Sequence, residues 1–365
     1  MIKSCDSGSL PFVGDSVKFL EGTKHINFQK NDDSSEYEKL VVKSFLDKLQ
    51  VGIDVPNYPQ FRDMKEMFLY MMEGVEQMDT GYFETAIPSL KADSSLIPEV
   101  AVIERNSQLI QEMNGEAFEV RVCVTGPYTL ASFFPYRDER TFSRLENVIS
   151  QILEKNLFSN KHGKTSLVSV DEPLFGLMDD PLIDFGSEGR ENLRKSWETI
   201  FNKIKSKNLQ TMVHLHSTAN PLFWEVPSLN VIDSHVDDPL IHLKKTKELL
   251  ESRDKFLKAS IAVNDFDMLI KRKLISDMQE KLSESDINEK IADVWTGIKR
   301  GTVDPVVFLE NVETMKNRLV KVIERFGEER VSYLGPECGL KGYPTYENAF
   351  ECLRRVSRVA KSFKK

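Results

Sequence analysis

Cysteine is scarce in this sequence, and the signatures of several protein classes are missing. The chain has 365 residues and four cysteines, at positions 5, 123, 338 and 352, too few for a disulfide framework, so reduced thiols and a cytoplasmic location are expected. No apolar run approaches the roughly 18 residues that span a bilayer, and no apolar segment of a secretory signal follows Met1–Cys5. The net charge is −8 and no block of Lys and Arg occurs, so neither a membrane nor a nucleic-acid partner is expected.

The chain does have an ordinary globular composition, 40% hydrophobic and 29% charged, in which strand-like and helix-like segments alternate. Such alternation is typical of parallel βα units. The predicted strands end near Ser9, Val55, Val124, Val170, Leu215, Asp233, Ile298 and Leu334. Because eight such strands close a barrel, we predict an α/β fold with one domain over 1–365, a single (β/α)8 TIM barrel with insertions.

Apolar residues spaced three and four apart predict amphipathic helices over 193–204, 308–326 and 346–363. Residues 21–45 are polar and acidic, and we predict an extended loop there. The stretch 257–291 begins with a strand-like run and continues as a charged helical pattern. Because 293–303 also ends like a barrel strand, we interpret 257–291 as an insertion and 293–303 as the seventh strand.

Two histidines and one cysteine at predicted strand ends form the most informative pattern. His214 and His216 are two residues apart, so both side chains can point to the same side of their strand. Cys338 follows another strand on a Gly/Pro turn, a poor place for core packing. Each has a plainer interpretation, a strand cap or solvent-facing imidazole for the histidines and a small buried apolar side chain for the cysteine. Brought together at the mouth of a barrel, the three predict a zinc site.

Further polar residues end other predicted strands. Asp171 and Glu172 precede a proline that stops the strand, and one of them could face the barrel mouth as a base or as a partner for a substrate ammonium, although Asp171 could also cap a helix. His235 shares a strand face with Asp233, but could equally lie on the surface beside acidic neighbours. Gly126 lies in a turn that lets a ligand or neighbouring loop approach closely.

Four motifs, in order along the chain, resemble those of the catalytic (C-terminal) domain of cobalamin-independent methionine synthase. They are Gly8-Ser9-Leu10-Pro11, Val124-Thr125-Gly126-Pro127, Val170-Asp171-Glu172-Pro173 and Pro336-Glu337-Cys338-Gly339-Leu340. Together they are similar to the superfamily that unites this synthase with uroporphyrinogen decarboxylase and corrinoid-dependent methyltransferases. The resemblance implies a (β/α)8 barrel in which a zinc ion activates the thiol of homocysteine for methylation.

By this resemblance the zinc ligands are His214 and Cys338, and the remaining two positions are His216, where the family has Cys, and His235, where it has Glu. Three neutral imidazoles and one thiolate leave Zn²⁺ with a net charge of +1, against −1 in the family. Imidazole also suits other divalent transition metals. Substrate binding is expected at Ser9, Asp171, Glu172 and Gly126, with Asp171 also the catalytic carboxylate.

Two departures from the family bear on the reaction. The chain has no room for the second domain of the folate-using synthases, so a methyl-corrinoid, or a corrinoid protein, is the expected donor. The family's His-Gly-Glu motif is absent, and the sequence there reads Val55-Pro56-Asn57-Tyr58. We therefore predict a zinc-dependent methyltransferase that converts homocysteine to methionine. The alternatives are coenzyme M or another small thiol as acceptor, or a non-catalytic protein that binds a corrinoid or a metal. A decarboxylase would leave the His/Cys set unused.

Overall fold

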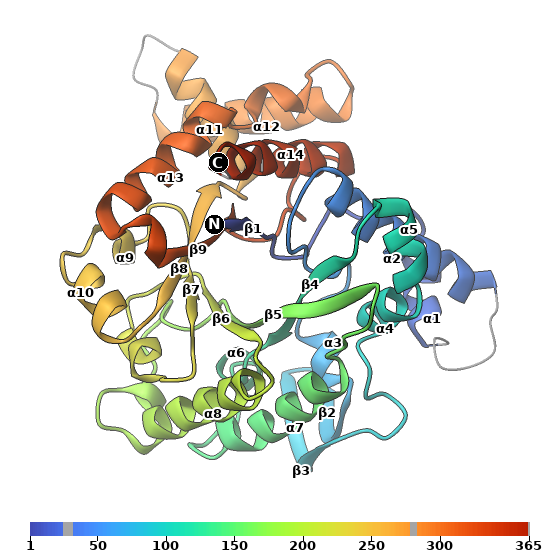
Figure 1. Ribbon diagram of the computed structural model, residues 1–365, viewed down its shortest axis with the longest axis vertical. Helices are drawn as coiled ribbons and strands as arrows, with labels where there is room; N and C mark the ends of the chain where they lie inside the picture. The colour runs from blue at the N-terminus through green and yellow to red at the C-terminus, as the bar shows by residue number, and fades with distance from the viewer. Residues whose placement is uncertain (25–31, 278–282, 364–365) are drawn as a thin grey trace.

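The computed structural model describes residues 1–24, 32–277 and 283–363. Seven parallel strands form one curled sheet, in the spatial order β1-β9-β8-β7-β6-β5-β4, with helices around it (Figure 1). The strands are β1 (Lys3–Ser4), β4 (Phe118–Thr125), β5 (Gly163–Glu172), β6 (Gln210–Leu215), β7 (Val231–Asp233), β8 (Phe256–Ala262) and β9 (Val331–Pro336). A separate antiparallel hairpin comprises β2 (Met72–Met78) and β3 (Gly81–Leu90).

The gap between the two edge strands, β1 and β4, is occupied by residues 55–57. Val55 forms a single parallel bridge with Cys5, and Asn57 forms one with Arg121. The predicted strand ending near Val55 is therefore present as a bridging segment without a continuous ladder. The fold is TIM-barrel-like, with seven strands in the sheet where the sequence predicted eight.

Helices follow the strands and cover the outside of the sheet. The α-helices are α1 (Ser16–Lys24), α2 (Asp32–Gln50), α3 (Glu66–Leu69), α4 (Pro98–Arg105), α5 (Ser107–Asn114), α6 (Pro127–Ala131), α7 (Thr141–Lys155), α8 (Glu188–Lys205), α9 (Pro239–His242), α10 (Lys245–Ser252), α11 (Phe266–Asp277), α12 (Glu284–Lys299), α13 (Val312–Phe326) and α14 (Tyr346–Ser362). Short 3-10 turns are η1 (Pro181–Ile183), η2 (Pro221–Glu225), η3 (Pro305–Phe308) and η4 (Glu328–Arg330). The three predicted amphipathic helices are confirmed as α8, α13 and α14.

The predicted insertion and seventh strand were wrong. Residues 256–262 form β8, which pairs with β7 on one side and β9 on the other. Residues 293–303 do not form a strand, because most of them belong to α12, whose buried Ile287 and Ile291 recur at the four-residue spacing of a helix face. Ser283 and Asp286 form a capping box at its start, a local signal for a helix that the strand interpretation overlooked.

The predicted loop over 21–45 was also wrong, although residues 25–31 lie outside the described part of the chain. Within it, α2 is a long helix whose Tyr37, Val41 and Phe45 are buried at four-residue intervals. The abundance of charge around this stripe concealed the helical period in the sequence. No helix among the described residues is long and apolar enough to cross a bilayer.

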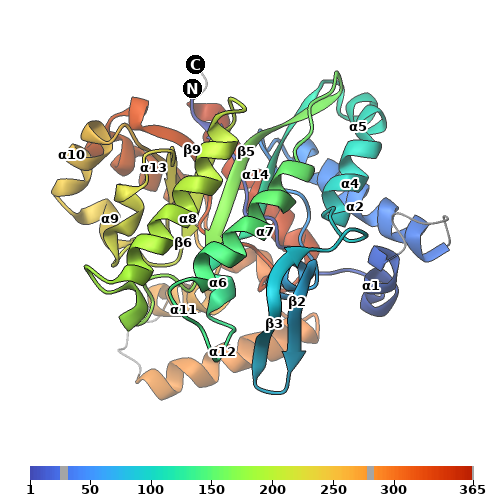
Figure 2. The same ribbon diagram turned by 90° about the horizontal axis from the view of Figure 1, so that it is seen from below.

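Side chains inside the curled sheet change character along the strands. Near the strand starts, Leu167, Met212, Val231 and Tyr333 form a small apolar cluster with their neighbours. Further along, polar and charged side chains replace them. Since β1 begins at the N-terminus, the carboxyl ends of these parallel strands lie at the opposite end, where hairpin β2–β3 and helix α12 project (Figure 2). This carboxyl-end face is the mouth, where active sites of such folds lie.

Candidate metal centre

Strand register places four ionisable residues in one row across the inside of the sheet. Asp171 on β5 pairs with His214 on β6, His214 with Asp233 on β7, and Asp233 with Lys258 on β8. Residues paired across parallel strands face the same side, so acid, imidazole, acid and amine alternate along the row. A row of buried charges is stable only if its members pair with one another.

Asp233 is the centre of this row and is fully buried. Its Oδ1 accepts a hydrogen bond from Lys258 Nζ at 2.7 Å, and its Oδ2 lies 3.0 Å from His214 Nδ1. Burial alone would raise the pKa of Asp233, but the adjacent Lys258 and His214 outweigh it and hold the pKa well below its usual range. The ionised carboxylate therefore fixes the ring of His214, with Nδ1 toward Asp233 and Nε2 toward the mouth.

His216 directly follows the end of β6, His235 lies beyond the end of β7, and Cys338 follows β9. One ligand atom from each of His214, His216, His235 and Cys338 lies within 4.8 Å of the other three. The Sγ of Cys338 is 3.4 Å from His216 Nε2. The rings of His216 and His235 have centroids 4.3 Å apart. The four side chains that the sequence predicted as ligands thus converge on one point.

Glu337 attaches the turn that carries Cys338 to two neighbouring loops, the one after β7 and the one after β8. One carboxylate oxygen of Glu337 accepts from the backbone N–H of Val236 and the other from that of Asn264, each at 2.9 Å. Its own N–H donates to the carbonyl of Ala262. Because Val236 directly follows His235, these bonds hold two of the candidate ligands in register with each other.

The protonation of the cluster fits a metal site. Burial would raise the pKa of the Cys338 thiol, but the three surrounding imidazoles of His214, His216 and His235 hold the pKa well below its usual value. Burial would lower the pKa of His214, but Asp233 and Cys338 raise it to about 10. Among the described residues, the Nε2 atoms of His214 and His235 are buried without a hydrogen-bond partner. A thiolate and two unpartnered imidazole nitrogens match the ligand set of a divalent transition metal such as zinc.

A cavity of about 220 Å³ opens beside the cluster at the mouth. It is lined by Ser7, Ser9, Gln60, Arg62, Asp63, Met64, Asp171, Pro173, His214, His216, Cys338, Gly339 and Lys341. The structure thus brings together Ser9, Asp171 and three of the four candidate ligands. Asp171 does not cap a helix. Its Oδ1 accepts from Ser169 Oγ at 2.6 Å and pairs with Arg121 at 3.3 Å, and no described residue donates to Oδ2.

Glu172 and Gly126 do not line this cavity. Glu172 is fully buried, and its carboxylate accepts from the backbone N–H groups of Tyr128 and Thr129 at the start of α6, and from Trp197 Nε1. Gly126 lies against it, since a Cβ there would come within 2.2 Å of the Glu172 carboxyl carbon. The close approach expected at this glycine occurs with a neighbouring side chain. Burial raises the pKa of Glu172 to about 7.

Sequence reasoning missed two buried cations that support the site. Arg121 on β4 is fully buried and lies 3.3 Å from Asp171 and 3.9 Å from Asp233. Lys258 on β8 is paired with Asp233 and also donates to the carbonyl of Pro336. A lone cation inside an otherwise apolar strand was the available signal, because such a residue needs a buried partner.

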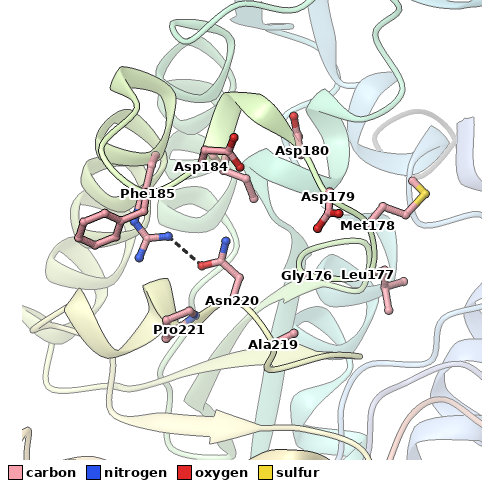
Figure 3. A pocket seen from close by; sticks show the side chains of 12 residues that line it. Gly176, Leu177, Met178, Asp179, Asp180, Asp184, Phe185, Ala219, Asn220 and Pro221 are labelled. Atoms are coloured by element: carbon pink, nitrogen blue, oxygen red, sulfur yellow. Dashed lines mark hydrogen bonds between the residues drawn. The ribbon is translucent and has the colours of Figure 1, made fainter.

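A larger cavity, of about 620 Å³, is lined by the loop that follows β5 and by residues 219–221 (Figure 3). Asp179, Asp184 and Asn220 line it together with exposed apolar side chains such as Phe185. Its one buried cation, Arg190, is already bonded to Asn220 and Glu225, both at 2.8 Å. None of the predicted site residues lines this cavity.

No family model matches the sequence, and no curated protein matches it. Solved structures do. A B12-independent methionine synthase from Shewanella sp. W3-18-1, in complex with selenomethionine, superposes with a TM-score of 0.60 at 13% identity, over 99% of this chain and 97% of that chain. A candidate vitamin-B12-independent methionine synthase from Listeria monocytogenes gives 0.57 at 14% identity, over 100% and 99%. A methyltransferase from Methanosarcina mazei gives 0.54 at 12% identity, over 100% and 94%.

The chain has a methionine-synthase-like fold. The superpositions extend over nearly the full length of both partners, so the likeness in fold covers the whole chain. At such low identity the likeness is one of fold, and the chemistry has to be argued from the site itself.

Proposed function

We propose that this protein is a metal-dependent methyltransferase in which the whole chain, 1–365, is one catalytic domain. In this proposal His214, His216, His235 and Cys338 bind zinc, and residues 55–57 act as the eighth strand of a (β/α)8 barrel. The observation that carries the proposal is the convergence of four ligand atoms within 4.8 Å beside a cavity at the mouth that Asp171 lines. The methionine-synthase-like fold supports a thiol as the acceptor.

The acceptor that suits the cavity best is homocysteine. Its thiol would approach the cluster, its ammonium would meet Asp171, and its carboxylate would meet the turn at Ser9. Asp171 is suited to a cation because its Oδ1 is held by Ser169 and Arg121, while Oδ2 has no donor among the described residues. Glu172 and Gly126 contribute by fixing α6 behind this wall.

A bound zinc ion would supply Lewis acidity, which lowers the pKa of the acceptor thiol so that it loses its proton at neutral pH. The thiolate sulfur then attacks the methyl group with a lone pair and forms the S–CH₃ bond. With a methyl-corrinoid donor the cobalt–carbon bond breaks and the corrinoid keeps the bonding pair. The described cysteines are all unpaired, which suits a reducing compartment, and we place the reaction in the cytoplasm.

One observation favours a different function. Four protein ligands already fill a tetrahedral shell, whereas catalytic zinc sites keep a position open. An acceptor would have to enter as a fifth ligand or displace one side chain. If neither occurs, the cluster is a closed site and the protein binds metal without catalysis.

The test is a methyl-transfer assay with metal-loaded and metal-stripped protein. Methylcobalamin and methyltetrahydrofolate serve as donors, and homocysteine and coenzyme M as acceptors. We expect metal-dependent turnover with methylcobalamin and homocysteine. Faster turnover with the folate would overturn the donor, and faster turnover with coenzyme M would overturn the acceptor. No turnover with any pair, in protein shown to contain metal, would favour the binding function.

A further inference from the structure

A further cavity, of about 410 Å³, reaches the ligand cluster at His235. Its lining comes from the end of β7, from β8, and from helices α9, α11 and α13. The cavity of about 220 Å³ is lined by the other three members of the cluster, and no described residue lines both cavities. The space beside His235 is therefore separate from the space proposed for the thiol acceptor.

Cations predominate among the charged side chains of this lining. Among the described residues, one carboxylate lines the cavity, that of Asp237, and the cations are Lys258, Arg272, Arg318 and Lys321. The side chain of Asp237 is 70% exposed and lies 3.9 Å from Arg272, so water screens this pair. Lys258 is already paired with Asp233 at 2.7 Å. We call this space the basic cavity, and the positive charge available in it is that of Arg272, Arg318 and Lys321.

The two arginines of the basic cavity share one counter-ion, Glu310. Its Oε1 lies 3.3 Å from Arg272 Nη1, and its Oε2 accepts from Arg318 Nη1 at 2.8 Å. One carboxylate cannot neutralise two guanidiniums. Arg318 Nη1 also donates to the carbonyl of Ile261 at 2.8 Å, so this half-buried guanidinium is fixed before any ligand arrives. No described carboxylate lies within 4.0 Å of the Nζ of Lys321, which adds to the excess of positive charge.

Polar donors accompany these cations. Ser234 is 4% exposed and lines the basic cavity, and no described residue forms a hydrogen bond with its Oγ. On α13, Thr314 and Asn317 lie three and four residues from Arg318 and Lys321, so the four side chains share one face of the helix. The cavity thus combines excess positive charge with hydroxyl and amide donors, a combination that suits an anion with several oxygens.

We propose that the basic cavity is a second ligand site, which binds the phosphate group of a small phosphorylated metabolite. Arg272, Arg318 and Lys321 would oppose the phosphate charge, and Ser234 would donate to one of its oxygens. Guanidinium groups suit phosphate because their planar N–H donors match its oxygens. A volume of about 410 Å³ leaves room for the organic part of such a ligand beside the phosphate. The inference concerns a ligand other than the thiol acceptor and does not depend on methyl transfer.

The experiment measures anion binding to the full-length, zinc-loaded protein by calorimetry, without a thiol or a methyl donor. The probes are glycerol 3-phosphate, inorganic phosphate and succinate, which separate a phosphate ester from free phosphate and from a dicarboxylate. Metal-stripped protein is titrated in parallel, because phosphate can also bind a metal ion directly. We expect glycerol 3-phosphate to bind most tightly and succinate most weakly, and we expect the phosphate ester to bind the metal-stripped protein as well.

Four variants locate the binding. Ser234→Ala should weaken glycerol 3-phosphate by about tenfold, the scale of one hydrogen bond to a charged group, and should not lower stability, because the hydroxyl has no described partner. Arg272→Met and Lys321→Met should each weaken it by about two- to fivefold, because both side chains are exposed and screened, and together by about tenfold. Lys316→Met is the matched control, since Lys316 lies on α13 but does not line the cavity.

Several results would overturn the inference. Wild-type affinity for glycerol 3-phosphate in both Ser234→Ala and Arg272→Met/Lys321→Met would show that the basic cavity is not the site. An equal loss in Lys316→Met would assign the effect to general surface charge, and binding only to zinc-loaded protein would place the phosphate on the metal. Succinate or free phosphate binding as tightly as the ester would reject a phosphorylated metabolite as the ligand. Methyl transfer without phosphate binding leaves the proposed function standing, and phosphate binding without methyl transfer leaves the second site standing.

Discussion

Asp233→Asn is the substitution that probes the metal centre most directly without touching a ligand. Asparagine keeps the shape of the side chain but removes its charge. In the wild type, Asp233 lies 3.0 Å from His214 Nδ1, 2.7 Å from Lys258 Nζ and 3.9 Å from Arg121. The variant therefore loses the group that orients His214, and it also leaves a buried ammonium without its partner.

Two separate losses are expected. Removal of an outer-shell carboxylate behind a ligating histidine typically lowers metal affinity by about 10- to 100-fold. Breaking a buried ion pair on one side typically costs about 3–5 kcal/mol of stability. The double variant Asp233→Asn/Lys258→Met removes both charges, so it should recover much of the stability and little of the metal affinity. A competition titration with a chelator measures the affinity, and urea unfolding measures the stability.

The pH dependence of metal binding gives the same test a second readout. In the metal-free protein the pKa of His214 is raised to about 10, so the ring carries an extra proton at neutral pH. Metal binding must displace the proton on Nε2, whereas Cys338 is already a thiolate. Affinity should therefore rise about tenfold per pH unit between pH 7 and about 9, with one proton released per metal. In Asp233→Asn the pKa of His214 loses the larger of the two influences that raise it, so the pH range over which affinity rises should become narrower.

Unchanged metal binding in Asp233→Asn would refute the role assigned to Asp233. If Asp233→Asn binds metal with wild-type affinity and releases the same proton, then either His214 is not a ligand or Asp233 does not orient it. A loss of affinity that the double variant fully restores would show that the effect came from instability and not from the histidine.

Three further predictions concern single residues. Cys338→Ser should lower zinc affinity by orders of magnitude, because it removes the one thiolate of the cluster, and stoichiometric zinc at unchanged affinity would show that the ligand assignment is wrong. Asp171→Asn should weaken homocysteine by roughly 1.5–3 kcal/mol and barely affect coenzyme M, which lacks the ammonium; equal losses in calorimetry would reject the role of Asp171. The pKa of Glu172, raised from 4.5 to about 7, means that the folded state favours the protonated form, so the contribution of Glu172 to stability is greatest below about pH 4.5 and falls by on the order of 3 kcal/mol as the pH rises to 7 and beyond. Urea unfolding of wild type and Glu172→Gln across this range checks it, and an equal slope in both proteins would assign the effect to another group.

Much of the candidate site could be predicted from short stretches of sequence. The two-residue spacing of His214 and His216 follows the strand period, and the Gly/Pro turn around Cys338 indicates a strand end. In a parallel fold all such ends meet at one face, so the convergence of these side chains follows from fold class and local pattern together. The helices α8, α13 and α14 were predictable for the same reason, since their apolar stripes are regular.

The errors arose where the local pattern was ambiguous. Residues 258–263 and 293–303 both ended like strands, and the pairing partners on β7 and β9 decided between them. The roles of Arg121 and Lys258 depend on which strands lie beside β5 and β7, and no local signal specifies that. Strand alternation predicted that one of Asp171 and Glu172 faces the mouth, and the tertiary structure decided that it is Asp171, because the carboxylate of Glu172 accepts from the start of α6 and from Trp197.

Local sequence was sufficient for the regular amphipathic helices, the strand-end motifs and the kind of ligands, because these depend on residues a few positions apart. Only the folded sheet decided that Asp233 supports His214, that Lys258 neutralises Asp233 and that Cys338 lies beside His216. Those contacts join residues 19 to 122 positions apart, and they exist because strand register and sheet curvature set which side chains meet. Register is a property of the paired strands, so it cannot be read from either strand alone.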